Sequence, residues 1–160
     1  MKAALLIKSI KPHQLKAGWV LLTVLLTILL FMYTAVSKLL DYEKFVFQMQ
    51  LAPIAWMDAW APIIAWVLPL VEIAVVILLY KQQTRIWGMR IALMLMLCFE
   101  VYIIWMKVLE SQTGIHLPCT CGGIISTMGW NTHLLFNAIF ILLLSLSIYY
   151  AYKNKQKRLD

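Results

Sequence analysis

The sequence predicts an all-α integral membrane protein, a bundle of four transmembrane helices with both termini in the cytoplasm. Three observations predict this fold: an apolar composition, four long apolar runs, and basic residues gathered on one side of those runs. Of the 160 residues, 63% are hydrophobic and only 13% are charged, whereas a soluble domain is nearer half apolar and a quarter charged. A chain this small cannot hide so much apolar surface in its own core.

Each of the four apolar runs is long enough to form a membrane-spanning helix. The runs cover about residues 19–36, 63–80, 86–107 and 134–152. About 20 mostly apolar residues cross roughly 30 Å of hydrocarbon as a helix, and a helix satisfies its own backbone in lipid. We therefore expect a single membrane domain over residues 1–160, with outer connections at 37–62 and 108–133. The first run also has an alternative interpretation as a cleaved signal peptide, although its apolar stretch is longer than usual.

Lysine and arginine residues give the predicted bundle a direction. Eleven of the 14 basic residues lie before the first run, after the fourth, or near the connection between the second and third, where Arg90 lies just inside the third run. The other side holds only Lys38, Lys44 and Lys107. Because basic residues concentrate on the cytoplasmic side of membrane proteins, both termini are expected there, in a bacterial inner membrane. The net charge of +7 therefore reflects topology and lipid head groups, and no nucleic-acid partner is expected.

The first outer connection is rich in aromatic residues. Its apolar residues form helical clusters that we expect to be broken at Pro53 and Pro62. Aromatic rings prefer the membrane interface, so the connection is predicted to hold one or two short interfacial helices.

The second outer connection contains the most unusual motif, Cys119-Thr120-Cys121-Gly122-Gly123. The predicted topology places the motif in the periplasm, where disulfides form. Two cysteines one residue apart can close only a tight ring, and strained disulfides tend to be the labile or catalytic ones. Such a bond closes almost no loop and adds little stability. Gly122 and Gly123 let the backbone turn and let another chain come close.

Three uses of the cysteine pair remain open from the residues alone. The first is redox exchange with a partner thiol, and the second is a static feature without a chemical role. The third is metal capture, in which His116 joins Cys119 and Cys121 in a site suited to copper(I) or zinc. The remaining cysteine, Cys98, lies within the third run and is interpreted as a small buried hydrophobic residue.

A few polar residues within the spans are candidate supporting residues. Glu72 and Glu100 are the acids inside the runs, and a carboxyl group in hydrocarbon usually faces the bundle interior. Each is either a proton relay or polar pocket, or a hydrogen bond between helices. Asn137 is interpreted as a contact between helices or as support for the cysteine motif. Lys38 either reaches the head groups or turns inward towards a glutamate.

Several segments resemble the MauE/DoxX family of membrane proteins, and in particular its MauE branch. The resemblance extends from about residue 20 to 150. In that branch a Cys-x-Cys pair precedes the last helix, which later carries an asparagine; here Gly122 stands where an aromatic residue is often found. The matching segments are FMYTAVSKLLDYEKF at 31–45, LPLVEI at 68–73, the motif at 118–123 and Asn137.

The resemblance implies a four-helix membrane protein associated with redox maturation. In methylamine utilisation, MauE is thought to work beside a thioredoxin-like periplasmic protein that makes disulfides in an amine dehydrogenase subunit. Carried over by position, Cys119 and Cys121 would be the redox pair. The leading hypothesis is then a membrane thiol–disulfide oxidoreductase that exchanges with such a partner and with a membrane carrier, for example a quinone. The alternatives are a non-catalytic membrane anchor of a redox or secretion complex, and a copper-handling protein.

Overall fold

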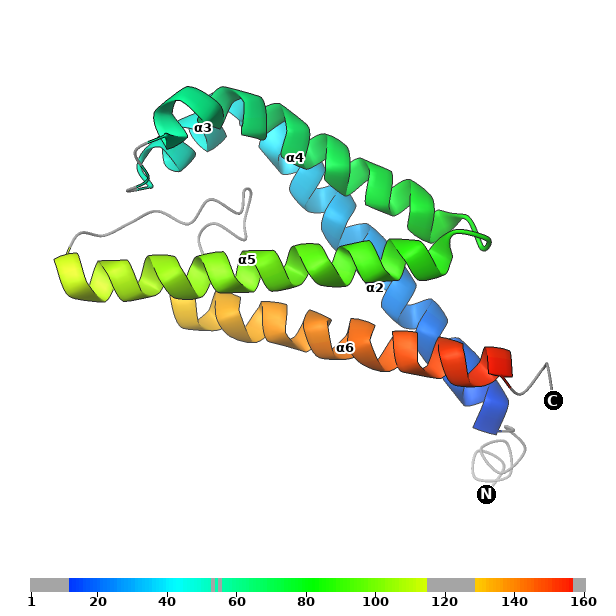
Figure 1. Cartoon of the computed structure of the whole chain (residues 1–160). Helices are drawn as coiled ribbons and strands as arrows, with labels where there is room; N and C mark the ends of the chain where they lie inside the picture. Colours follow the sequence, from blue (N-terminus) through cyan, green and yellow to red (C-terminus); the bar gives the residue numbers. More distant parts are fainter. Residues whose placement is uncertain (1–11, 53, 55, 115–128, 157–160) are drawn as a thin grey trace, which may run out of the picture.

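The computed structural model describes residues 12–52, 54, 56–114 and 129–156. Within them the chain forms five helices and no strand (Figure 1). In chain order these are α2 (Pro12–Leu40), α3 (Tyr42–Gln50), α4 (Met57–Tyr80), α5 (Arg85–Thr113) and α6 (Trp130–Gln156). The prediction of an all-α bundle with four long helices and a short helix in the first connection is therefore confirmed.

The four long helices form a closed ring, in which each packs against two neighbours. Helix α2 contacts α4 and α6, and α5 contacts the same two helices from the other side, while α3 packs on α4. The first turns of α2 and the last turns of α6 lie at one end of the bundle, towards which the α4–α5 turn also points (Figure 1). We call this the terminal end and the opposite end, where α3 lies, the α3 end.

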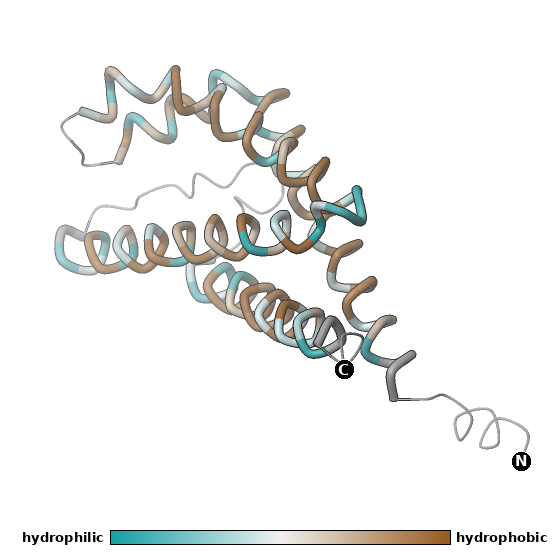
Figure 2. The backbone as a smooth tube through the Cα atoms, turned by 45° about the vertical axis from the view of Figure 1, so that its right-hand side comes forward, coloured by the Kyte–Doolittle hydropathy of each residue, from teal (hydrophilic) through white to brown (hydrophobic). Residues whose placement is uncertain are grey.

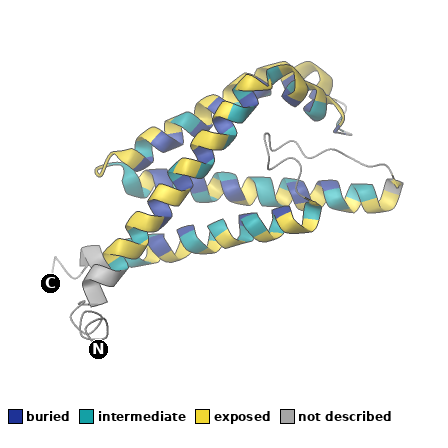
Figure 3. Cartoon of the chain, turned by 180° about the vertical axis from the view of Figure 1, so that it is seen from behind, coloured by how far each residue is buried: buried dark blue, intermediate teal, exposed yellow. Residues whose placement is uncertain are grey.

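The outer surface of the ring is apolar along its length. Within the long helices, segments of 24 to 28 residues are apolar enough to cross a membrane; at 1.5 Å per residue the shortest extends for about 36 Å, more than the hydrocarbon core. Hydrophobic residues dominate these helices (Figure 2), and exposed positions run along them (Figure 3). Leu29, Val101 and Leu135 are each more than 60% exposed. An apolar surface of this kind belongs in lipid rather than water.

The turn between α4 and α5 is held by close backbone packing and by two side-chain caps. The Thr84 hydroxyl donates to the Leu78 carbonyl at 2.9 Å, and Arg85 Nε donates to the Leu79 carbonyl at 3.2 Å. These bonds satisfy carbonyls that the end of α4 leaves free. Gly88 lies so close to α4 that a Cβ there would be 2.8 Å from the Leu79 nitrogen. The absence of a side chain at Gly88 therefore allows the two helices to meet.

The expected helix break at Pro62 is wrong, because Pro62 lies inside α4. A proline has no N–H to donate to the carbonyl four residues earlier, here that of Asp58. The Gln50 side chain donates to this carbonyl instead, at 3.5 Å. In addition, the Tyr42 hydroxyl donates to the Pro62 carbonyl at 3.1 Å. Side chains of α3 thus compensate for the proline, and the helix continues through it. The other expected break, at Pro53, lies outside the described residues.

Two apolar clusters fill the interior, one towards each end of the bundle. The cluster at the terminal end consists of Val24, Phe31, Val75, Val76, Leu79, Met89, Ala92, Met96 and Leu144. The cluster at the α3 end consists of Phe45, Met49, Ala52, Met57, Ala61, Ala65 and Met106. Buried charged residues lie between the two clusters, and they define the candidate site.

Candidate functional site

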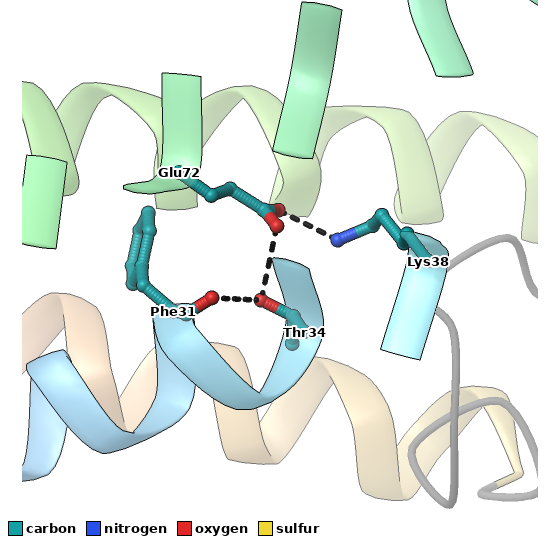
Figure 4. A network of polar contacts seen from close by, with 4 residues as sticks. All are labelled: Phe31, Thr34, Lys38 and Glu72. Atoms are coloured by element: carbon teal, nitrogen blue, oxygen red, sulfur yellow. Dashed lines mark hydrogen bonds and ion pairs between the residues drawn. The ribbon is translucent and has the colours of Figure 1, made fainter. Parts of the chain in front are cut away.

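An ion pair between Lys38 and Glu72 occupies the interior of the bundle (Figure 4). Lys38 Nζ donates to Glu72 Oε1 at 2.6 Å, and only 3% of the Lys38 side chain and 1% of the Glu72 side chain are exposed. Lys38 lies in the last turn of α2 and Glu72 in the second half of α4. Of the two orientations considered for Lys38, the structure shows the inward one, towards a glutamate.

Aromatic rings from two further helices hold the lysine in place. The ammonium nitrogen of Lys38 is 5.9 Å from the centre of the Phe45 ring of α3 and 5.8 Å from that of Phe99 of α5. A cation over an aromatic face is attracted by the ring's quadrupole, and more strongly where water is excluded. The pair is therefore enclosed by side chains of α2, α3, α4 and α5.

Thr34 adds a third polar group to the pair. Its hydroxyl lies 3.2 Å from Glu72 Oε2 and 3.1 Å from the carbonyl of Phe31 (Figure 4). A hydroxyl has one proton to donate and lone pairs with which to accept. Thr34 therefore donates to one of these two oxygens at a time.

A cavity of about 40 Å³ opens beside the ion pair. Its polar lining comes from α2, α4 and α6, and its apolar lining includes side chains of α5. Of the residues around it, five carry the polar groups: Thr34, Lys38, Glu72, His133 and Asn137. A buried water needs about 10–15 Å³ of such volume, so the cavity has room for two or three water molecules.

A second polar group adjoins the cavity from α5 and α6. The Glu100 carboxyl is hydrogen-bonded by the Asn137 side chain and lies near His133. His133 is 2% exposed and Asn137 5% exposed. Glu100 Oε2 is buried and has no hydrogen-bond partner among the residues that the structure describes. Asn137 thus connects helices, as one of its two interpretations proposed.

The structure brings together four of the eight predicted site residues. Lys38 meets Glu72 and Glu100 meets Asn137, and three of these residues (Lys38, Glu72 and Asn137) line one cavity. The other four lie outside the described residues, as does the candidate metal ligand His116. These four are Cys119, Cys121, Gly122 and Gly123.

The interpretation of Cys98 as a buried residue is wrong. Its side chain is exposed on the outside of α5. Met96 is buried, whereas its neighbours Leu97 and Cys98 both face outward. Consecutive helical positions differ by about 100° around the axis, so proximity in sequence to a buried methionine does not make a residue buried. Cys98 faces the lipid side of the bundle.

Thr34 and His133 are site residues that the sequence interpretation missed. Their spacing offers a signal: Thr34 lies one turn before Lys38, and His133 lies one turn before Asn137. Residues four apart share a face of a helix. If Lys38 faces inward, Thr34 therefore does so too, and the same holds for Asn137 and His133.

The described part of the site suits water better than a larger ligand. Pockets for organic ligands occupy about 300–1,000 Å³, far more than the 40 Å³ found here. The cavity as lined by these residues therefore does not accommodate a quinone ring. Among the described residues, no three His, Cys, Asp or Glu side chains come together in an arrangement that holds a metal ion.

Fold and site together define a class: a multi-pass membrane protein with four long helices and a cluster of charged groups beside an internal cavity. The family described as "Methylamine utilisation protein MauE" matches residues 15–150. Because this match covers most of the chain, the protein belongs to the MauE family. The searches of curated proteins and of solved structures gave no match.

Proposed function

We propose that the protein is a membrane thiol–disulfide relay that uses Cys119 and Cys121. The observation that carries this proposal is the Cys-Thr-Cys motif in the connection between α5 and α6 of a MauE-family chain. Helix α5 ends at Thr113 and is capped by Gly114, which is in the left-handed conformation with φ 67°, a conformation that glycine adopts without strain. The connection that carries the motif therefore begins at the α3 end, the end that also holds the charged cluster.

The proposed exchange moves two electrons and two protons from a dithiol to a disulfide. A thiolate of one pair attacks the disulfide of the other, a mixed disulfide forms, and a second thiolate resolves it. One pair leaves as a disulfide and the other as a dithiol. The proposed partner is a periplasmic thioredoxin-like protein. Return of the motif to its starting state needs a second redox partner, either another thiol–disulfide protein or a membrane quinone that binds outside the cavity described above.

The relay requires the α3 end to face an oxidising compartment. We propose an orientation in a bacterial inner membrane with both termini in the cytoplasm, supported by the eleven basic residues on the terminal side. Four spans return the chain to the side where it began, in agreement with the shared end of α2 and α6 (Figure 1). We also propose that residues 1–160 form a single membrane domain.

Capture of mixed disulfides in cells tests the relay. The single variants Cys119→Ala and Cys121→Ala each leave one thiol without its resolving partner. We expect one of them to accumulate a covalent complex with a thiol protein, visible as a band that disappears on reduction. The matched control is Cys98→Ala, which removes the lipid-facing thiol and should trap nothing. The double variant Cys119→Ala/Cys121→Ala should also trap nothing and should lose redox maturation.

Two outcomes would replace the relay with another function. If the double variant supports maturation fully and neither single variant traps a partner, the protein is a non-catalytic anchor or accessory subunit. If the reduced wild-type protein instead purifies with copper or zinc that the double variant lacks, the motif is a metal site with His116 as the natural third ligand.

A further inference from the structure

Each of the four long helices contributes one titratable side chain to the region around the cavity. Lys38 of α2, Glu72 of α4 and His133 of α6 line the cavity, and Glu100 of α5 adjoins it through its hydrogen bond with Asn137. Helix α3 contributes an aromatic ring, that of Phe45, near the lysine. A static ion pair between α2 and α4 needs neither the groups from α5 and α6 nor an adjoining cavity.

We propose that this cavity is a proton-binding site, in which bound water connects the Lys38–Glu72 pair to His133 and Glu100. A proton then moves among these groups without leaving the bundle. The ligand of the site is a proton, carried by two or three water molecules. The site is distinct from the cysteine motif. Its residues Lys38, Glu72 and His133 are buried, and Glu100 is partly exposed with a buried Oε2.

The polar groups around the cavity are of the kind that bind water. Buried water typically makes about three hydrogen bonds to polar groups. The cavity offers Thr34, the ion pair, His133 and Asn137 as partners, and Glu100 Oε2 is a buried acceptor next to Asn137. Leaving a carboxylate oxygen buried without a partner costs free energy. Water in the cavity removes that cost and joins the two polar groups.

The geometry at Thr34 accepts both protonation states of Glu72. When Glu72 is a carboxylate, the Thr34 hydroxyl donates to its Oε2 at 3.2 Å. When Glu72 carries a proton on Oε2, it donates to the Thr34 oxygen, and the Thr34 hydroxyl turns to the Phe31 carbonyl at 3.1 Å. Both oxygens are already in place, so a proton arrives or leaves without movement of the backbone.

The formal charge of the cluster favours uptake of one proton. In the form with ionised Lys38, Glu72 and Glu100 and a neutral His133, the four side chains carry one positive and two negative formal charges. The cluster then has a net charge of about −1, which is costly to bury. One additional proton, shared by Glu100, His133 and Glu72 through water, makes it neutral.

The connection to thiol chemistry rests on the proposed function. In exchange between a dithiol and a disulfide, each attacking thiol loses a proton and each leaving thiolate later gains one. This site would hold one such proton between the two steps, at the same end of the bundle. The proton-binding site is tested independently of the relay, because the experiment below uses the full chain with Cys119→Ala and Cys121→Ala, in which no relay operates.

The experiment measures how the ring of His133 titrates in lipid nanodiscs. Histidine is isotopically labelled for NMR, and the His133 signal is assigned with His133→Gln. Glu100→Gln removes a negative charge beside the ring, and we expect it to lower the proton affinity about tenfold, which is one pH unit. Glu72→Gln, across the cavity, should also lower it. Lys38→Met removes a positive charge and should raise it.

The opposite sign for Lys38→Met separates a shared proton site from general loosening of the fold. Loosening would move every variant towards the behaviour of a solvent-exposed histidine, in one direction. If Lys38→Met alone does not fold, Lys38→Met/Glu72→Gln is compared with Glu72→Gln. The proton affinity of His133 should again be higher in the variant that lacks Lys38. The control, Ser147→Ala, breaks a buried hydrogen bond to Thr23 away from the cavity and should leave the midpoint unchanged. A midpoint that Glu72→Gln and removal of Lys38 leave unchanged, or move in the same direction, would overturn the proposal.

Discussion

The two ends of the bundle join their helices with different chemistry. Towards the terminal end, a neutral contact crosses between α2 and α6, where the Ser147 hydroxyl donates to Thr23 Oγ1 at 2.9 Å. Towards the α3 end, α2 meets α4 through the charged pair Lys38–Glu72 at 2.6 Å. Both contacts are buried, and apolar clusters adjoin both. The Lys38–Glu72 contact is charged and lies beside a cavity, whereas the Ser147–Thr23 contact is neutral.

This difference indicates which end has a function beyond packing. A hydroxyl–hydroxyl contact holds two helices together at a small desolvation cost. A buried ion pair has a desolvation cost that often equals or exceeds the attraction between its charges, so packing alone does not favour it over apolar residues. Charged residues inside membrane spans are therefore candidates for function. Here the charges lie on the same side as the connection that carries Cys119 and Cys121.

The largest expected effect comes from leaving one member of the ion pair alone. Lys38→Met should lower the free energy of unfolding by about 3–5 kcal/mol, because it leaves Glu72 buried without a counter-charge. Glu72→Leu should have an effect of similar size. Reversible unfolding in mixed micelles measures both.

The double variant Lys38→Met/Glu72→Leu sharpens this test. Replacement of a whole buried ion pair by apolar residues is often neutral or stabilising, so most of the lost stability should return. We expect this double variant to fold, but His133 should no longer share a proton with position 72. Single variants that cost less than about 1 kcal/mol would show that the pair is open to water and contributes little.

A smaller effect is expected from the close packing at the terminal end. Gly88→Ala places a Cβ 2.8 Å from the Leu79 nitrogen and 3.0 Å from the Leu78 carbonyl carbon. Backbone atoms cannot move aside as a side chain can, so α4 and α5 must separate, at a cost of about 1–3 kcal/mol. Gly18→Ala is the matched control, since no atom lies within 4 Å of its added Cβ. That control should stabilise α2 by about 0.5–1 kcal/mol, and an equal loss in both variants would argue against close packing at Gly88.

Thr34→Val should destabilise the protein by about 1–2 kcal/mol, because Glu72 Oε2 loses the one hydrogen-bond donor that the described residues give it. Valine is close to threonine in shape, so the lost stability measures the contribution of the hydroxyl. Thermal unfolding measures the change, and Thr34→Ser, which keeps the hydroxyl, should recover most of it. If the serine variant is no more stable than the valine variant, the methyl group rather than the hydroxyl contributes the stability.

The smallest effect is expected at the neutral contact between α2 and α6. Ser147→Ala removes its donor and should cost about 0.6 kcal/mol, the average for hydrogen bonds between membrane helices. The same unfolding assay applies. A cost as large as that of Lys38→Met would remove the distinction between the two ends.

The bundle was predictable because its signals extend over whole helices. Apolar runs and basic flanks depend on many residues, so single errors do not matter. Single side chains were harder. Cys98 was expected inside and faces outward. It lies about 200° around the axis of α5 from Glu100, whose carboxyl marks the inner face of that helix. Lys38 had two plausible orientations, and only the position of Glu72 on a separate helix decides between them. Pro62 continues its helix because Gln50, twelve residues earlier in the chain, replaces the missing donor.

The central claim is that the charged α3 end faces the oxidising side of the membrane. Labelling of intact spheroplasts with a membrane-impermeant thiol reagent tests it most directly. In a Cys98→Ser variant, after mild reduction, Cys119 and Cys121 should react from outside. A cysteine in the α4–α5 turn, Gln82→Cys in a chain without the native cysteines, should react only after permeabilisation. The reverse pattern would place the cysteine motif in the cytoplasm and contradict the relay.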